Sequence, residues 1–116
     1  MKGCVFCRIA NKEIRPEIIF EDDLVIAFLD ANPVSKNHAL IIPKNHYENI
    51  FDIPKKELER IIIVAKDLAM KYKKDFNIND INLLNANGKN AQQSVFHFHL
   101  HLIPRHEKDG LDLWLK

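Results

Sequence analysis

The residues with the clearest chemical potential lie in one short segment near the end of the sequence. The chain contains six histidines, and four of them fall between His97 and His106. His97, His99 and His101 alternate with apolar residues, so a β-strand here would place these three imidazoles on one face. The other face would carry Phe96, Phe98, Leu100 and Leu102. We expect the apolar face to pack against a helix and the histidine face to be solvated or functional.

Three interpretations of the histidine face are open: a polar surface, a metal site and a catalytic site. Alternate side chains on a strand lie about 6.6 Å apart, which is wide for neighbouring ligands of one metal ion. A neutral imidazole is a good nucleophile near neutral pH because it need not first lose a proton, and flanking imidazoles can orient it and hydrogen-bond a phosphate. Neutral hydrogen-bonding side chains suited to an anion lie just upstream, at Gln92, Gln93 and Ser94.

The chain has two cysteines, Cys4 and Cys7, separated by two residues. This spacing can chelate zinc, and a redox pair or two incidental thiols are the alternatives. A thioredoxin-like redox pair needs a strand before it, and only three residues precede Cys4. The first residues have no apolar segment typical of a secretion signal, so we expect a cytoplasmic, reducing location without a disulfide.

Short apolar runs ended by turn-forming residues predict the elements that would position these groups. Strands are expected at residues 17–21, 24–29, 39–42, 81–84 and 95–103. The short connections between the early strands favour an antiparallel sheet. One long helix is expected over residues 52–74, with Asp52 as its N-cap and Pro54 in its first turn. Its inward face would carry Leu58, Ile61, Ile62, Ala65, Leu68, Ala69 and Tyr72.

Composition limits the class of protein. The chain has 116 residues, which we expect to form a single domain over residues 1–116. Its net charge of +1 lacks the basic excess of a general nucleic-acid binder. No apolar run approaches the ~20 residues of a membrane span, so neither a nucleic acid nor a membrane is expected as a partner. The three glycines lie far apart, which excludes a P-loop and a GxGxxG dinucleotide-binding turn.

The region from Gln93 to Arg105 resembles the signature of the histidine-triad (HIT) family, His-x-His-x-His followed by apolar residues. The likeness begins at Cys4 and includes residues 38–46, which read His-x-Leu-x-Ile-Pro-Lys-x-His. The branch it most resembles is that of the Hint-type nucleotide hydrolases. This resemblance implies an α+β, HIT-like fold: an antiparallel sheet of about five strands, one long helix and a short N-terminal helix. It also implies a homodimer that extends the sheet, and Trp114 in the apolar tail offers surface for such an interface.

The resemblance assigns roles in catalysis. His99, the middle histidine, would attack the α-phosphorus of a nucleotide and form a nucleotidyl-histidine that water then hydrolyses. A main-chain carbonyl would hold the other ring nitrogen of His99. His101 would hydrogen-bond a phosphate oxygen, His38 would lie near the phosphate, and Ser94 would reach the leaving-group atom.

Further positions match the family's nucleotide site. Asp30 would bind the ribose hydroxyls, although an aspartate at this position also suits a turn. Asn87 and Gln93 would supply further polar contacts. The slot for the base would be formed by Val5, Phe6, Ile9, Phe28 and Leu40, each of which is alternatively plain core.

Two positions depart from the family pattern. Gln92 stands where relatives often have a glycine whose amide approaches the phosphate. Ala86 stands where they often have an Asn or Gln that contacts phosphate, and Asn85 or Asn87 can substitute for it. Both departures bear on rate and leaving-group preference, because neither removes the nucleophile.

The resemblance also extends the Cys4 and Cys7 pair to a zinc set that includes His46 and His97. Four protein ligands leave no open position, so this zinc would be structural. His97 would then belong to the metal site, while His99 carries out the chemistry.

The function implied is hydrolysis at the α-phosphate of nucleoside phosphoramidates or related nucleotidyl conjugates, with a purine nucleotide as the ligand. One alternative is a dinucleoside polyphosphate hydrolase or phosphorylase, which would use the same nucleophile on another leaving group. Another is a nucleotide-binding interaction module with low turnover. The intact set of His38, Ser94, His99 and His101 argues against the module, since simple binding needs no nucleophile.

Overall fold

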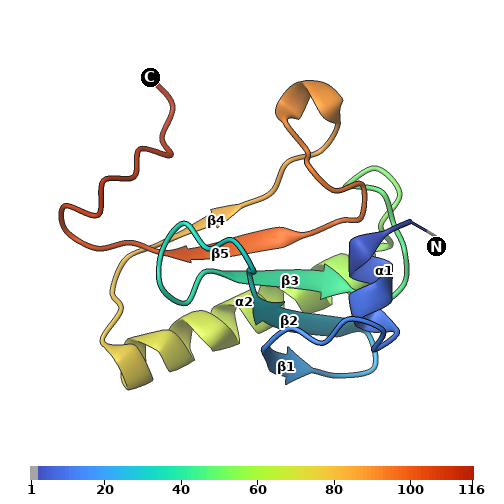
Figure 1. Ribbon diagram of the computed structural model, residues 1–116, viewed down its shortest axis with the longest axis horizontal. Helices are drawn as coiled ribbons and strands as arrows, with labels where there is room; N and C mark the ends of the chain where they lie inside the picture. The colour runs from blue at the N-terminus through green and yellow to red at the C-terminus, as the bar shows by residue number, and fades with distance from the viewer. Residues whose placement is uncertain (1–2) are drawn as a thin grey trace.

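A computed structural model describes residues 3–116 as a five-stranded sheet with helices on both sides (Figure 1). The strands are β1 (Ile18–Glu21), β2 (Val25–Leu29), β3 (Ala39–Pro43), β4 (Ile81–Leu84) and β5 (Leu100–Pro104). The helices are α1 (Val5–Ala10), α2 (Lys55–Phe76) and the short 3-10 helix η1 (Lys89–Ala91). The expected α+β class is confirmed. Among the described residues, no helix has the length and apolar character needed to cross a membrane.

The strand order is β1-β2-β3-β5-β4, and every neighbouring pair is antiparallel. The first three strands follow one another through short connections, as expected. After α2 the chain forms β4 at the edge of the sheet and then inserts β5 between β3 and β4. This insertion pairs Leu40 with His101 and Ile41 with Leu100, so the histidine strand lies inside the sheet and is held from both sides.

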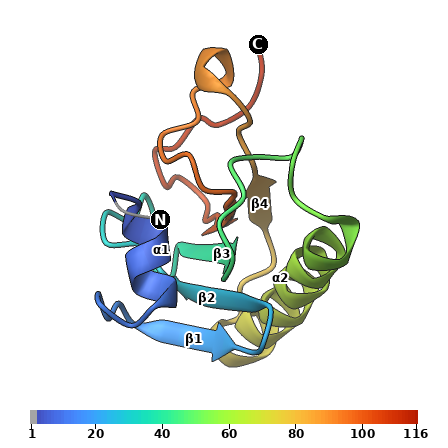
Figure 2. The same ribbon diagram turned by 90° about the vertical axis from the view of Figure 1, so that its right-hand side faces the viewer.

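The two faces of the sheet carry different layers, with α1 and α2 on opposite sides (Figure 2). The α2 side is one apolar cluster that includes Ile41, Leu100 and Leu102. On the other side, Phe6 and Ile9 of α1 pack on strand residues of a second cluster. Because side chains alternate along β5, His101 lies on the α1 side while Leu100 and Leu102 face α2. The expected separation of an apolar core face from a face that carries His101 is therefore confirmed.

Helix α2 begins and ends later than the expected range of 52–74. Asp52 does not cap it, because its carboxylate accepts the main-chain N–H groups of Glu48 and Asn49 and closes the preceding turn instead. The helix ends at Phe76 because the next residue, Asn77, adopts a left-handed conformation with φ of 56°. Its buried face also differs from the expected one, because Val64 is buried and Ile62 is exposed.

The expected strand over residues 95–103 is wrong in extent, since β5 spans only Leu100–Pro104. The segment before it bonds to a loop, because the N–H of Phe98 donates to the carbonyl of Tyr47 at 2.7 Å. Phe98 nevertheless faces the α2 core, as predicted. Phe96 does not, because it is 44% exposed and lies outside both clusters.

Candidate functional site

Three histidines from two parts of the sheet meet on its α1 side. His101 belongs to β5, His99 directly precedes that strand, and His38 lies just before β3. The ring centroids of His99 and His101 are 5.0 Å apart, and those of His101 and His38 are 5.1 Å apart. Antiparallel pairing of β3 with β5 produces this cluster, because it sets the beginning of β3 beside the middle of β5.

The main chain selects the tautomer of His99. Its Nδ1 lies 2.9 Å from the carbonyl oxygen of His97, and only a protonated nitrogen can donate to a carbonyl. Nε2 therefore keeps its lone pair. Burial lowers the pKa of the ring, against the opposing effect of the bond to the His97 carbonyl. His99 is thus neutral near pH 7 and presents an unprotonated nitrogen, as a nucleophile requires.

A second main-chain contact selects the tautomers of His38 and His101. The N–H of Val34 donates to Nδ1 of His38 at 3.2 Å, so the proton of this neutral ring sits on Nε2. That Nε2 lies 2.9 Å from Nδ1 of His101, to which it donates. His101 consequently carries its own proton on Nε2. One backbone amide thus fixes a two-imidazole chain that ends in a hydrogen-bond donor.

The same geometry argues against a metal ion at this end of the site. Asp30, His38 and His101 bring possible ligand atoms together, with Asp30 Oδ2 3.6 Å from His38 Nε2. However, a metal-binding histidine normally donates its other ring N–H, whereas His38 accepts there from Val34. The proton on Nε2 occupies the position that a cation would need.

Acid is expected to destabilise the free protein through His101 and His38. Burial, reinforced by the neighbouring His99 and His38, lowers the pKa of His101 to about 4, while Asp30 acts in the opposite direction. Burial also lowers the pKa of His38, again opposed by Asp30. In the unfolded chain both rings have a pKa of about 6.5. Below that pH the unfolded chain therefore binds more protons than the folded one, and the free energy of unfolding falls as the pH falls.

For His101 alone we expect a loss of roughly 2 kcal/mol in the free energy of unfolding between pH 7 and pH 5, measured by urea unfolding. The matched control combines His38→Asn with His101→Asn, which removes the titrating pair and keeps both cysteines, His46 and His97. The loss in this variant should be smaller by at least this amount, because the titration of His38 is removed as well. Equal losses in the two proteins would contradict the expected linkage.

A cavity of about 440 Å³ opens beside these histidines, between α1 and the sheet. It brings together eight of the residues expected at the catalytic and nucleotide sites. These are Phe6, Ile9, Phe28, Asp30, Leu40, Ser94, His99 and His101. Val5, which the resemblance also placed at the base, lines it as well. One wall is apolar and Asp30 lies with the histidines, so the cavity offers an apolar slot and polar groups in one space.

Sequence reasoning missed several residues of this cavity. The segment after α1 contributes Ile14, Arg15 and Pro16, and Val95 follows Ser94 in the wall. No motif marks these positions, and only the packing of this segment over the sheet brings them in. Asp30 combines both of its interpretations, since its Oδ1 accepts the N–H of Asn32 in a turn while its other oxygen faces His38.

The loop before the histidines holds Asn87 and Gln93 outside the lining of this cavity. Gln93 is buried, and its amide donates to the carbonyls of Glu48 and Val95 while accepting the N–H of Gly88. Asn87 accepts the N–H of Ile50 and donates to Asn85. Both side chains therefore order the loop in this structure.

The departures from the family pattern fall in the same loop. Asn85 donates to the carbonyl of His99 at 2.9 Å, so it supports the main chain at the entry to β5. Gln92 adopts a left-handed conformation with φ of 67°, which a glycine would reach with less strain. Its main-chain N–H donates to Lys89, so that amide is engaged within the loop.

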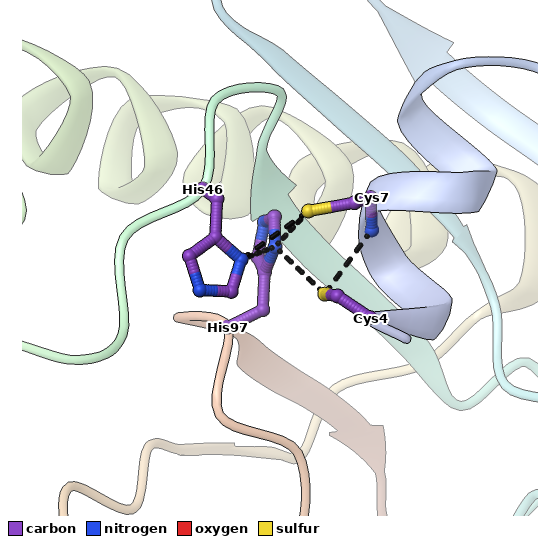
Figure 3. Close-up of side chains that lie close together, drawn as sticks. All are labelled: Cys4, Cys7, His46 and His97. Carbon is purple, nitrogen blue, oxygen red and sulfur yellow. Dashed lines mark hydrogen bonds between the residues drawn. The ribbon is translucent and has the colours of Figure 1, made fainter. Parts of the chain in front are cut away.

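A second cluster of four side chains, Cys4, Cys7, His46 and His97, lies beside the first (Figure 3). Cys7 Sγ is 3.2 Å from His46 Nδ1 and 3.5 Å from His97 Nδ1, and the two Nδ1 atoms are 3.2 Å apart. Ligands at zinc bond lengths in a tetrahedron would lie about 3.3 Å (N to N) and 3.6 Å (N to S) apart. The four donors can thus hold one metal ion in a closed tetrahedral site.

Local structure orients these donors. Cys4 is the N-cap of α1, and its sulfur accepts the N–H of Cys7 at 3.3 Å, which brings the two sulfurs to one side. The fully buried His97 has Nε2 2.8 Å from the carbonyl oxygen of Pro43, so Nε2 is the protonated nitrogen and Nδ1 is free for a metal. Burial lowers the pKa of His97 to about 4, against the opposing effect of that carbonyl, and keeps the ring neutral.

Known proteins resemble this chain in both sequence and structure. Residues 11–108 match the family model described as the HIT domain. HNT1, an adenosine 5'-monophosphoramidase of Saccharomyces cerevisiae, is 45% identical over 110 residues, which cover 94% of this chain and 67% of that protein. A HIT family protein from Bacillus anthracis has a similar structure, with a TM-score of 0.92, 44% identity, and coverage of 99% of this chain and 82% of the other. A zinc-bound histidine triad family protein from Mycobacterium smegmatis has a TM-score of 0.90 and 32% identity, with coverage of 96% and 81%.

Proposed function

This chain belongs to the HIT family, and on that basis we propose that it is a nucleotide hydrolase that cleaves nucleoside phosphoramidates or related nucleotidyl conjugates at the α-phosphate. The observation that carries the proposal is the unprotonated Nε2 of His99 in the wall of the cavity, fixed by the His97 carbonyl. The similarity to a yeast adenosine 5'-monophosphoramidase supports the reaction class and an adenine nucleotide as the ligand.

The reaction would proceed in two displacements. Nε2 of His99 attacks the α-phosphorus and forms a nitrogen–phosphorus bond, while the bond from phosphorus to the leaving nitrogen breaks. The leaving amine keeps that electron pair and takes a proton, which we assign to the Ser94 hydroxyl. Water then attacks phosphorus, returns a proton to Ser94 and releases the nucleotide from His99.

The groups around His99 would stabilise charge on the phosphoryl oxygens and position the nucleotide. The Nε2–H of His101 is held as a donor by the chain from Val34 through His38, so it needs no reorganisation to meet a phosphoryl oxygen. Asp30 would accept the ribose hydroxyls, since one of its oxygens is not used by the turn. The apolar wall from α1 and β2 would hold the base. Asn87 and Gln93 would act on the nucleotide only indirectly, by ordering the loop before Ser94.

The test is product analysis after incubation with an adenosine monophosphate (AMP)–amine conjugate and, separately, with a diadenosine polyphosphate. We expect release of AMP and the amine from the first, at the higher kcat/KM. Faster cleavage of the polyphosphate would favour the dinucleotide hydrolase instead. Binding of AMP without turnover of either compound would favour an interaction module.

We also propose that Cys4, Cys7, His46 and His97 hold a structural zinc ion. The donor set, its spacing and the orientation of His97 by Pro43 support this assignment, as does the zinc-bound relative. The metal would tie α1, which forms a wall of the nucleotide cavity, to the segment just before His99. Its role would be to position these elements, with no direct part in the chemistry.

The proposed assembly is a homodimer. Leu83 and Leu84 are exposed on the edge strand β4, and Trp114 and Leu115 are exposed in the tail. An unpaired edge with apolar side chains favours pairing with a second copy. Sedimentation at micromolar concentration should give twice the mass of the 13.5 kDa chain. A single 13.5 kDa species would contradict the dimer.

A further inference from the structure

A second cavity, of about 510 Å³, adjoins the nucleotide cavity. Val5, Ser94 and Val95 line both, so these three side chains form the boundary between them. The other residues described along the second cavity are Gly3, Cys4, His46, Glu48 and Phe96. Nothing in the catalytic scheme above uses Glu48 or Phe96.

The position of the second cavity relates it to the departing group. A nucleotide whose α-phosphorus meets His99 has its nucleoside in the first cavity, and its leaving group must depart on the side away from the attacking nitrogen. Ser94, which the proposed mechanism places at the leaving atom, is a wall of both cavities. A leaving group larger than ammonia would then pass Ser94 toward the second cavity.

The chemistry of the lining selects among leaving groups. Val5, Val95 and the half-exposed Phe96 supply apolar surface, and Glu48 is the one carboxylate among the described lining residues. The volume exceeds that of the nucleotide cavity, so size alone does not exclude a second nucleotide. Charge instead disfavours a polyphosphate chain, which would approach the exposed Glu48 carboxylate, whereas a neutral or cationic amine would not be repelled.

We propose that this second cavity receives the leaving group, and that Glu48 and Phe96 are specificity-determining residues that favour apolar amines over anionic polyphosphates. The inference rests on the proposed hydrolase function and adds a substrate preference to it. Phe96 provides a face for the apolar part of the amine. Glu48 acts through its charge on the leaving group attached to the α-phosphate.

The experiment measures kcat/KM for three compounds: adenosine 5'-phosphoramidate, whose leaving group is ammonia, an AMP–tryptamine conjugate, and diadenosine tetraphosphate. Glu48→Lys should raise the ratio of diadenosine tetraphosphate to AMP–tryptamine by about tenfold at low salt, and less at 0.5 M salt because the charge is exposed. Glu48→Gln should change the ratio in the same direction by a smaller factor. Glu59→Lys, an exposed charge reversal on α2, is the matched control and should leave the ratio unchanged.

Phe96→Ala should lower the ratio of AMP–tryptamine to adenosine 5'-phosphoramidate by about fivefold, through loss of an aromatic contact. Phe51→Ala is its control, because Phe51 is exposed and does not line the cavity. Wild-type cleavage with ratios that no Glu48 or Phe96 variant shifts would overturn this inference and leave the hydrolase proposal standing. Failure of the wild type to cleave all three compounds would overturn the proposed function, and this inference with it.

Discussion

Replacement of His99 by alanine is expected to reduce kcat by about 10⁴-fold or more while AMP binds nearly as before. In the proposed mechanism the substitution removes the atom that would bond to phosphorus, and this bond would contribute to the transition state and not to ground-state affinity. The base and ribose contacts, from the apolar wall and Asp30, stay in place. Steady-state kinetics with an AMP–amine conjugate and calorimetric titration with AMP would measure the two effects separately.

His101→Ala and Ser94→Ala serve as comparisons for this variant. Each removes one hydrogen bond at the transition state, and one preorganised donor is typically worth about 10²–10³ in rate. We therefore expect both variants to retain more activity than His99→Ala. Wild-type turnover in the His99→Ala protein would rule out His99 as the nucleophile. A larger loss of activity in His101→Ala than in His99→Ala would indicate that the nucleophile is not His99.

The second large effect is expected at the proposed zinc site. Cys4→Ser should lower the metal content of protein purified without added zinc and reduce the melting temperature by about 10 °C or more. Only three of the four donors would remain in this variant. Without the proposed metal, the buried His97 and Cys7 would lose the ion that links α1 to the segment before β5. Catalysis should persist in the fraction that remains folded, because the metal would lie beside the proposed nucleophile and would not contact the substrate.

His106→Ala is the control for the zinc experiment, since this histidine belongs to neither cluster. It should keep both the metal content and the melting temperature of the wild type. Elemental analysis would detect about one zinc per chain in the wild type. A zinc-free wild-type protein with the same melting temperature as a zinc-loaded sample would contradict the structural role.

Much of the fold follows from local patterns in the sequence. The strand predicted at 81–84 matches β4, and those predicted around β1, β2 and β3 differ from them by one residue at an end. The alternation of histidine and apolar residues correctly separated the core side of β5 from the side that carries His101. The convergence of Cys4, Cys7, His46 and His97 agrees with the set that the family resemblance supplied, since spacing alone gave only the cysteine pair.

What could not be predicted depends on long-range contacts. The strand expected to begin at residue 95 begins only at Leu100, because a main-chain bond to Tyr47 holds Phe98 away from the sheet ladder. The family resemblance supplied a main-chain carbonyl for His99, and the structure has the carbonyl of His97 there. The N–H of Val34, which sets the tautomers of His38 and His101, is a main-chain group that no side-chain motif encodes. Gln93 was expected at the nucleotide, yet its neutral amide equally suits the three main-chain groups it bonds in the loop.

The most direct test of the account is mass spectrometry of the wild-type protein quenched in acid-free denaturant during reaction with a slowly cleaved AMP conjugate. The proposed mechanism predicts an adenylyl group attached to the protein, and fragmentation should place it on the ring of His99. The modified species should be absent from the His99→Ala protein treated in the same way. An adenylyl group on another residue, or rapid turnover without any adduct in the wild type, would contradict the nucleotidyl-histidine at His99.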